Sequence, residues 1–219
     1  MTVHELRCQW KPVKERPAAE QSDHSTNVRL HRVFSWLQRA EQIEGDQDLD
    51  VALTCRWIAF NAMYGQWDEQ TQEPRPDRES WRRFTDRVLK LDSSQQTESV
   101  LVEHKKLVIA ILDDNFLGSY FWRDPTKERA FQTSKDRRLA AMWYIERRWS
   151  LVLEALLDRI YFLRCQLMHG AATYGSKLNR TSMRRCSIML GHLLSATMLV
   201  IINCGADEDW GPMCYPPVG

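Results

Sequence analysis

Apolar residues recur along most of the chain at intervals of three and four positions, which is the spacing of one face of an α-helix. The pattern predicts helices over residues 26–44, 48–65, 79–91, 95–113, 127–168 and 180–204, the fifth with an interruption near residue 133. Gly45 follows the first and Gly65 ends the second, as at many helix ends. No stretch alternates apolar and polar residues convincingly, so the sequence predicts an all-α fold with helices packed in antiparallel pairs.

Polar segments flank this predicted helical domain, which covers residues 26–205. Residues 1–25 are polar and contain prolines, so we expect a flexible arm that packs weakly and that folding does not need. Residues 206–219 hold three prolines and are expected to be irregular. Residues 66–80 carry two prolines and many charges, which predicts a surface loop between the second and third helices.

Charge and cysteine usage narrow the class of protein. Thirty Lys and Arg residues nearly balance 29 Asp and Glu residues, so any binding of nucleic acid must come from a local patch. Six cysteines form no Cys-x-x-Cys pair, and the N-terminus has no apolar core of a signal peptide. We therefore expect reduced cysteines and a cytoplasmic protein.

One segment is nearly long enough to cross a bilayer. Residues 187–205 are mostly apolar but include His192, Ser195, Thr197 and Asn203, and no second apolar span accompanies them. We interpret this segment as a buried core helix, with no membrane partner, and His192 as a hydrogen-bonded core histidine.

An arginine and a histidine interrupt the apolar run that ends the fifth predicted helix, in Leu-Arg-Cys-Gln-Leu-Met-His-Gly (163–170). Arginine is always charged, and imidazole titrates near neutral pH. Arg164 and His169 are about 140° apart around an ideal helix. They can meet one ligand only if the helix ends near His169, which Gly170 favours. The alternative is that both side chains cap the last carbonyls and complement the helix dipole.

The Arg-x-x-x-x-His motif, followed by glycine, a loop and a final apolar helix, resembles that of the HEPN superfamily. The segment Trp-Ile-Ala-Phe-Asn-Ala-Met-Tyr-Gly-Gln-Trp (57–67) is similar to the second-helix signature of the Apea-like HEPN branch. The resemblance covers roughly residues 27–204. It implies a HEPN-like bundle of long antiparallel helices, in which the motifs of two chains converge at a twofold interface.

The resemblance also implies an activity, namely that of an endoribonuclease that cleaves RNA by 2′-hydroxyl attack, in stress response or defence. It implies no metal and no cofactor, and its implied partners are RNA, a second copy of the chain and an antitoxin or defence-system protein. His169 and Arg164 match the motif residues, and Asn61 matches a polar position that lies near the site in the family. The chemistry agrees, because imidazole can shuttle protons and a guanidinium matches phosphate oxygens.

Two positions depart from the family's pattern. Cys165 follows the motif arginine, where active members usually have a polar residue, often Asn, and Ala171 stands where the toxin branch has Tyr. Antitoxin modification of that kind is therefore not expected. A second hypothesis follows from Cys165: a catalytically weak or inactive HEPN module that binds RNA or a partner protein.

Two basic stretches are candidates for contact with RNA. Lys177, Arg180 and Arg184 precede or begin the last helix, directly after the motif, and backbone N–H groups at a helix start favour phosphate. The alternative is a solvated basic face. Trp143 and Tyr144 lie among arginines and could stack on bases, although at helical spacing they suit a core or a dimer interface better.

Overall fold

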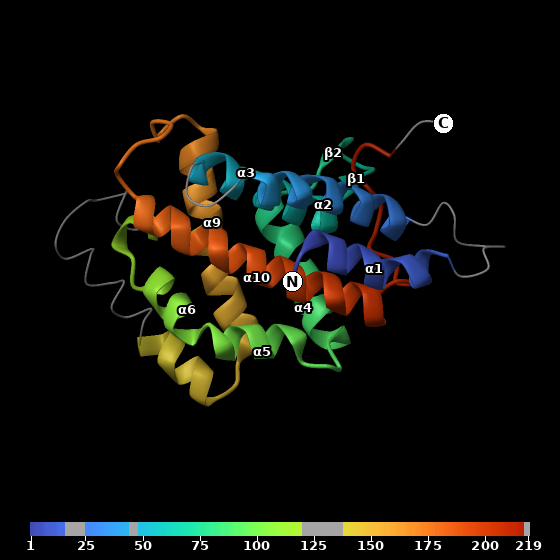
Figure 1. Ribbon diagram of the computed structural model, residues 1–219. Coiled ribbons are helices and arrows are strands. Elements are labelled where there is room, and N and C mark those ends of the chain that lie inside the picture. The colour runs from blue at the N-terminus through green and yellow to red at the C-terminus, as the bar shows by residue number, and fades with distance from the viewer. Residues whose placement is uncertain (16–24, 44–47, 120–137, 217–219) are drawn as a thin grey trace. The chain divides into compact units, whose positions relative to one another are not determined.

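The computed structural model describes residues 1–15, 25–43, 48–119 and 138–216, and these are mostly helical (Figure 1). The helices are α1 (Val3–Lys14), α2 (Ser25–Gln42), α3 (Leu49–Tyr64), α4 (Asp77–Leu91), α5 (Gln96–Glu103), α6 (Lys105–Leu112), α9 (Trp149–Met168) and α10 (Arg180–Cys204), with a short 3₁₀ helix η1 (Asn115–Leu117). Residues 138–145 are also helical. The predicted all-α class is confirmed.

A small hairpin lies within the predicted loop after α3. Strands β1 (Trp67–Asp68) and β2 (Glu73–Pro74) pair antiparallel, with Trp67 opposite Pro74. The carboxylate of Asp68 accepts the backbone N–H groups of Gln70 (2.9 Å) and Thr71 (3.3 Å), which closes the turn. These hydrogen bonds hold the pKa of Asp68 below its usual value. Strands of two residues are too short to show as alternation in the sequence.

Contacts divide the chain into two compact units. The first unit comprises residues 1–42, 55–96 and 194–219, and the second comprises residues 43–54 and 97–193. Helices α3 and α10 each contribute their first turns to the second unit and their last turns to the first.

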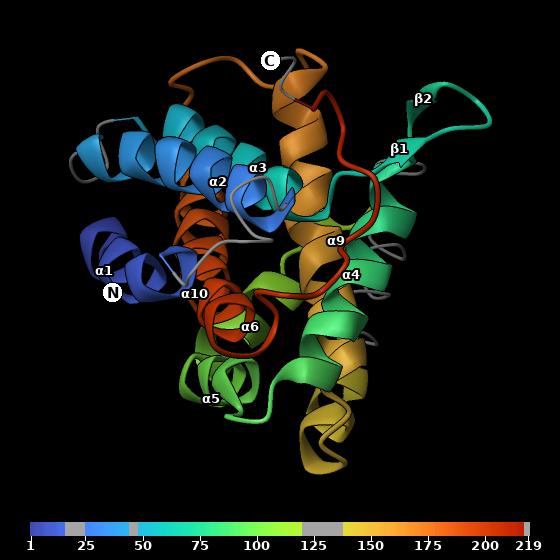
Figure 2. The same ribbon diagram turned by 90° about the vertical axis from the view of Figure 1, so that its right-hand side faces the viewer.

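The N-terminal segment is the main departure from the predicted fold. Instead of a loose arm, Val3–Lys14 form α1, which begins with a capping box between Thr2 and Glu5. Val3, Leu6 and Trp10 are buried, and α1 lies beside α2 (Figure 2). The three buried residues are three and four positions apart, so they lie on one face of the helix. This short apolar face is enough to pack α1 despite the surrounding charges and Pro12. Residues 16–24 lie outside the described part of the chain.

The first unit has an aromatic core. Its buried rings include Trp57, Phe60, Tyr64, Trp81, Phe84 and Trp210. The Phe60 ring centroid lies 4.9 Å from that of Tyr64 and 6.2 Å from that of Phe84, both edge-on. Trp210 belongs to the C-terminal segment. Residues 206–216 are irregular, as predicted, and the buried Trp210 anchors them in this core.

The second unit contains two helix breaks that the sequence pattern did not locate. The helix expected over 95–113 breaks at His104, between α5 and α6. The long helix expected to end at 168 breaks at residues 146–148, where Arg147 has φ +54°. Neither break has glycine or proline, so apolar periodicity runs through both. The interruption expected near residue 133 lies outside the described residues.

Helix α10 is long and apolar enough to cross a bilayer. Of its most apolar stretch, 67% is buried within the protein, as expected of a core helix. His192 lies on this helix, stacked on His104 with ring centroids 3.8 Å apart. This stacking packs α10 against the junction of α5 and α6.

Candidate functional site

Helix α9 ends at the motif histidine, as the sequence predicts. His169 is the C-cap residue and Gly170 follows with φ +69°. The N–H of Gly170 donates to the carbonyl of Leu167 (3.3 Å), and the N–H of Ala171 donates to that of Gln166 (2.9 Å). This pair of bonds is a Schellman motif. A Cβ at Gly170 would meet nothing within 4 Å, so it is the positive φ that favours glycine here.

The two motif side chains occupy different surroundings on α9. His169 is exposed, whereas Arg164 is half-buried. The guanidinium carbon of Arg164 lies 5.9 Å from the ring centroid of Tyr161, one turn earlier, close enough for a weak cation–π contact. Arg164 thus sits at the edge of the buried face, as expected, while the imidazole is open to solvent.

A cavity of about 390 Å³ lies where α9 meets the loop that follows it. The ribbon of this loop is orange in Figure 1. Its walls come from three segments of the second unit: Asp50; Phe162, Leu163 and Gln166; and Ala171, Ala172, Thr173, Ser176, Leu178, Asn179 and Met183. Neither motif residue lines it. Because Gln166 is two positions beyond Arg164, about 200° around the helix, the cavity and the guanidinium lie on opposite sides of α9.

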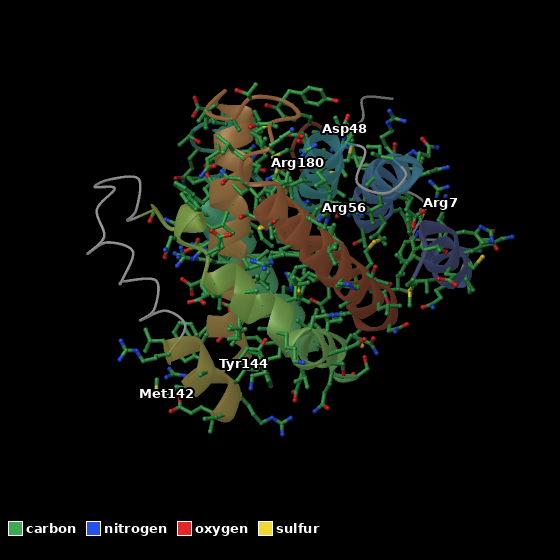
Figure 3. The ribbon with its side chains drawn as sticks, turned by 60° about the vertical axis from the view of Figure 1, so that its left-hand side comes forward. Arg7, Asp48, Arg56, Met142, Tyr144 and Arg180 are labelled. Carbon is green, nitrogen blue, oxygen red and sulfur yellow. The ribbon has the colours of Figure 1, made fainter. Side chains whose placement is uncertain are left out.

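Two carboxylates at the start of α3 hold the loop over this cavity. The phenol of Tyr174 donates to Asp48 (2.7 Å), and Arg180 forms an ion pair with the buried carboxylate of Asp50. Asp48 also caps α3 by accepting the N–H of Val51 (3.1 Å). Figure 3 labels Asp48 and Arg180 at the end of the second unit away from Met142 and Tyr144.

The carboxylate of Asp48 also affects the tyrosine. Its hydrogen bond to the phenol, together with its negative charge, raises the pKa of Tyr174, because both favour the protonated phenol. Neither contact was predicted, since Asp48, Asp50 and Tyr174 look like ordinary surface residues in the sequence. The capping position of Asp48 was the one local indication of a role.

The predicted RNA-binding cations differ in their surroundings. Lys177 and Arg184 are exposed. Arg180 is half-buried, and besides its pair with Asp50 its guanidinium lies 3.6 Å from the sulfur of Met183. Arg180 therefore has a structural partner that the sequence did not indicate, and its contact with RNA stays a prediction.

Asn61 belongs to the first unit, where it joins α3 to α4. Its side-chain N–H donates to Asp77 at the start of α4 (3.2 Å), and the phenol of Tyr64 donates to the same carboxylate oxygen (3.1 Å). A Cβ on Gly65 would come within 3.0 Å of the side-chain oxygen of Asn61. The Asn-Ala-Met-Tyr-Gly segment thus has a structural explanation, and a catalytic part for Asn61 stays a prediction.

The same helix end is closed by a buried cation. Arg29 is 3% exposed and donates to the carbonyls of Met63 (3.1 Å), Gly65 (2.7 Å) and Gly211 (3.0 Å). Burial lowers the pKa of Arg29, because desolvation disfavours the charged form. A cation is well placed at a helix C-terminus, where carbonyls lack partners.

Tyr144 occupies a core position, which is the alternative to base stacking that its helical spacing favoured. It is buried, and its phenol donates to the carbonyl of Leu101 (2.8 Å). Burial raises its pKa. Its ring meets that of Trp149 edge-on, with the centroids 5.4 Å apart.

Across the described residues, no group of three or more His, Cys, Asp and Glu side chains is arranged to hold a metal ion. Comparison with protein-family models, with curated proteins and with solved structures gives no match to this chain. The functional interpretation therefore depends on the residues and their geometry.

Proposed function

We propose that the protein is a HEPN-type, metal-independent endoribonuclease with Arg164 and His169 at its active site. The observation that carries this proposal is the end of α9. The Schellman motif stops the helix at His169 and leaves the imidazole exposed, while Arg164 lies half-buried slightly more than one turn earlier. An exposed imidazole can exchange protons with substrate, and a partly desolvated guanidinium binds phosphate more strongly than one in open water.

The reaction would be an internal transesterification. The RNA 2′-oxygen attacks the neighbouring phosphorus as its proton leaves, and the bond from phosphorus to the 5′-oxygen breaks as that oxygen gains a proton. The products are a 2′,3′-cyclic phosphate and a 5′-hydroxyl, so no water is consumed. A base and an acid are both required, and the negative charge on phosphorus oxygens needs a donor such as Arg164.

A homodimer supports this chemistry, because each chain has one motif histidine. Two chains would supply one imidazole as base and one as acid. Apolar side chains are exposed on α9, η1 and α10: Met168 at the end of α9 is 47% exposed, Phe116 47% and Ile188 on α10 44%. The carbonyl of Phe116 accepts from Gln166 on α9 (3.3 Å), which ties η1 to this helix end. We place the twofold interface across α9 and α10.

The test is RNA cleavage by purified protein, with the product ends identified. His169→Ala should lower the rate about 10²- to 10⁴-fold, the usual contribution of a positioned acid–base group. His4→Ala is the control, because His4 is exposed on α1. Arg164→Lys should also lose activity, since an ammonium cannot replace the guanidinium fork. EDTA should have no effect. Cleavage at the wild-type rate by His169→Ala would overturn the proposal.

The second candidate is a HEPN module that binds RNA or a partner protein without cutting. Cys165 favours it, because active members usually carry a polar residue there. In this case RNA would bind and remain intact with the wild-type protein. Cys165→Asn separates the candidates further: it should keep or raise activity in a nuclease.

A further inference from the structure

We propose that the cavity beside α9 receives one unpaired nucleobase of an RNA strand that passes the exposed His169 at the end of this helix. The inference rests on the proposed function and adds a recognition site that the motif itself does not supply. Three observations support it: the volume of the cavity, the neutrality of its walls, and an exposed lysine, Lys177, between two wall residues.

The volume and walls suit a planar heteroaromatic ring. About 390 Å³ falls in the range of small-molecule sites, roughly 300–1,000 Å³. Phe162, Leu163, Leu178 and Met183 supply apolar surface that suits the faces of a base. These apolar groups come from α9, from the loop and from α10.

The polar groups in the walls suit the edge of a base. Gln166 and Asn179 carry amides, and Thr173 and Ser176 carry hydroxyls, so donors and acceptors are both present. The charged wall residue, Asp50, is neutralised by its ion pair with Arg180. A neutral ligand is therefore favoured over an anion or a cation, and the common nucleobases are neutral at pH 7.

Lys177 and the motif histidine are close in sequence to residues of the cavity wall. Lys177 is exposed, and its chain neighbours Ser176 and Leu178 both line the cavity. His169 precedes Ala171, another wall residue, by two positions, so their Cα atoms are at most about 7 Å apart. A neutral interior with an exposed lysine beside it matches a nucleotide, whose base is neutral and whose phosphate is anionic.

Binding can be measured without cleavage, using the His169→Ala protein. The probes are fluorescein-labelled hexaribonucleotides of A, C or U, followed by fluorescence anisotropy at fixed salt. Ala172→Phe, added to His169→Ala, fills the cavity and should weaken at least one probe about 5- to 150-fold, the contribution of one stacked base. Ala141→Phe is the matched control, because Ala141 is exposed on helical residues 138–145 and does not line the cavity.

A second variant covers the case in which Ala172→Phe does not fold. Thr173→Val keeps the size of a wall side chain but removes its hydroxyl, and it should weaken the same probe. Free adenosine, cytidine and uridine, observed by saturation-transfer NMR, form the other arm. One outcome is that a free nucleoside binds, that Ala172→Phe abolishes this binding, and that no hexaribonucleotide binds. The proposal that the base belongs to RNA would then be overturned, and the cavity would be a site for free nucleosides.

The remaining outcomes separate this inference from the nuclease proposal. Probes that bind equally well to the Ala172→Phe and Ala141→Phe proteins would overturn the base site, even if His169 proves essential for cleavage. Sensitivity to Ala172→Phe without cleavage by wild type would support the base site and favour the binding module. Absence of binding by every probe would overturn the inference.

Discussion

At the scale of single residues, two arginine side chains hold parts of the first unit together. The guanidinium of Arg29 replaces water at three carbonyls, two of them at the end of α3. Arg32, one turn later on α2, donates to the carbonyls of Cys214 (2.9 Å) and Tyr215 (2.5 Å). Two arginines of α2 thereby hold the C-terminal segment, which has no regular secondary structure of its own.

Arg29→Ala should lower the free energy of unfolding by about 3 kcal/mol, because buried carbonyls lose their donors and a cavity remains. Urea unfolding followed by circular dichroism measures the change. Arg39→Ala on the same helix should cost less than about 0.5 kcal/mol, since Arg39 is exposed. Equal effects of the two substitutions would contradict the structural part given to Arg29.

Cysteine reactivity should follow burial. All six cysteines are free; Cys8 is exposed and Cys186 is buried. Burial raises the pKa of Cys186, because an apolar site disfavours the thiolate, which is the reactive form. In a DTNB titration at pH 8, Cys8 should react within minutes and Cys186 only after unfolding. Loss of the rapid phase in Cys8→Ser would show that this phase is the reaction of Cys8. Rapid reaction of Cys186 in the folded protein would contradict the prediction that burial protects it.

At the scale of elements, α1 is held by few but well-buried contacts. Leu6 is 1% exposed, and the N–H of Val3 donates to Glu41 near the end of α2 (2.7 Å). The beginning of α1 therefore meets the end of α2, and the two helices run antiparallel.

Leu6→Ala should cost about 2–4 kcal/mol, the usual loss for removing a buried leucine side chain. Thermal and urea unfolding both report it. Lys14→Ala, at the exposed end of α1, is the control and should change stability little. A Leu6→Ala variant as stable as wild type would support the sequence-based prediction that folding does not need residues 1–25.

The end of α9 depends on one glycine. Gly170→Ala should destabilise the protein by about 1–2 kcal/mol, the cost of a left-handed residue with a Cβ. Gly170→Asn should cost less, because asparagine tolerates this conformation. We expect urea unfolding to rank the proteins with Gly, Asn and Ala at position 170 in that order, from most to least stable. An alanine variant as stable as wild type would mean that α9 can end without the Schellman motif.

At the scale of the whole molecule, function and assembly are proposed to depend on one another. A surface lysine in place of Met168 would be buried in the proposed interface without a partner. Met168→Lys should therefore dissociate the dimer and lower cleavage at 1 µM protein by at least about tenfold, as for an interface hot spot. Lysine itself suits the last turn of a helix, so α9 should persist.

Light scattering at micromolar concentration measures the oligomeric state. Ile145→Lys is the matched control, because Ile145 is 82% exposed and lies on the helical residues 138–145, outside the proposed interface. The dimer proposal fails if wild type is a monomer at this concentration. It also fails if both lysine variants dissociate the protein to the same extent.

The sequence alone determined most of the helices. Apolar spacing located α2, α3, α4 and α10 within a few residues, and the glycine after His169 located the end of α9 but not its beginning. Both signals depend on neighbours within about one turn. Apolar spacing failed for α1, whose apolar face consists of three residues among charges. It also missed the breaks at His104 and Arg147, where no glycine or proline marks the chain.

The tertiary structure decided which side chains meet. Arg180 pairs with Asp50, which is 130 positions away in the chain, and Arg29 donates to the carbonyl of Gly211, which is 182 positions away. The cavity likewise draws its walls from α3, α9, the following loop and α10. Local propensity carries no information about such pairs, since each depends on how distant helices pack. The motif residues could therefore be named from the sequence, while their surroundings, and the cavity beside them, could not.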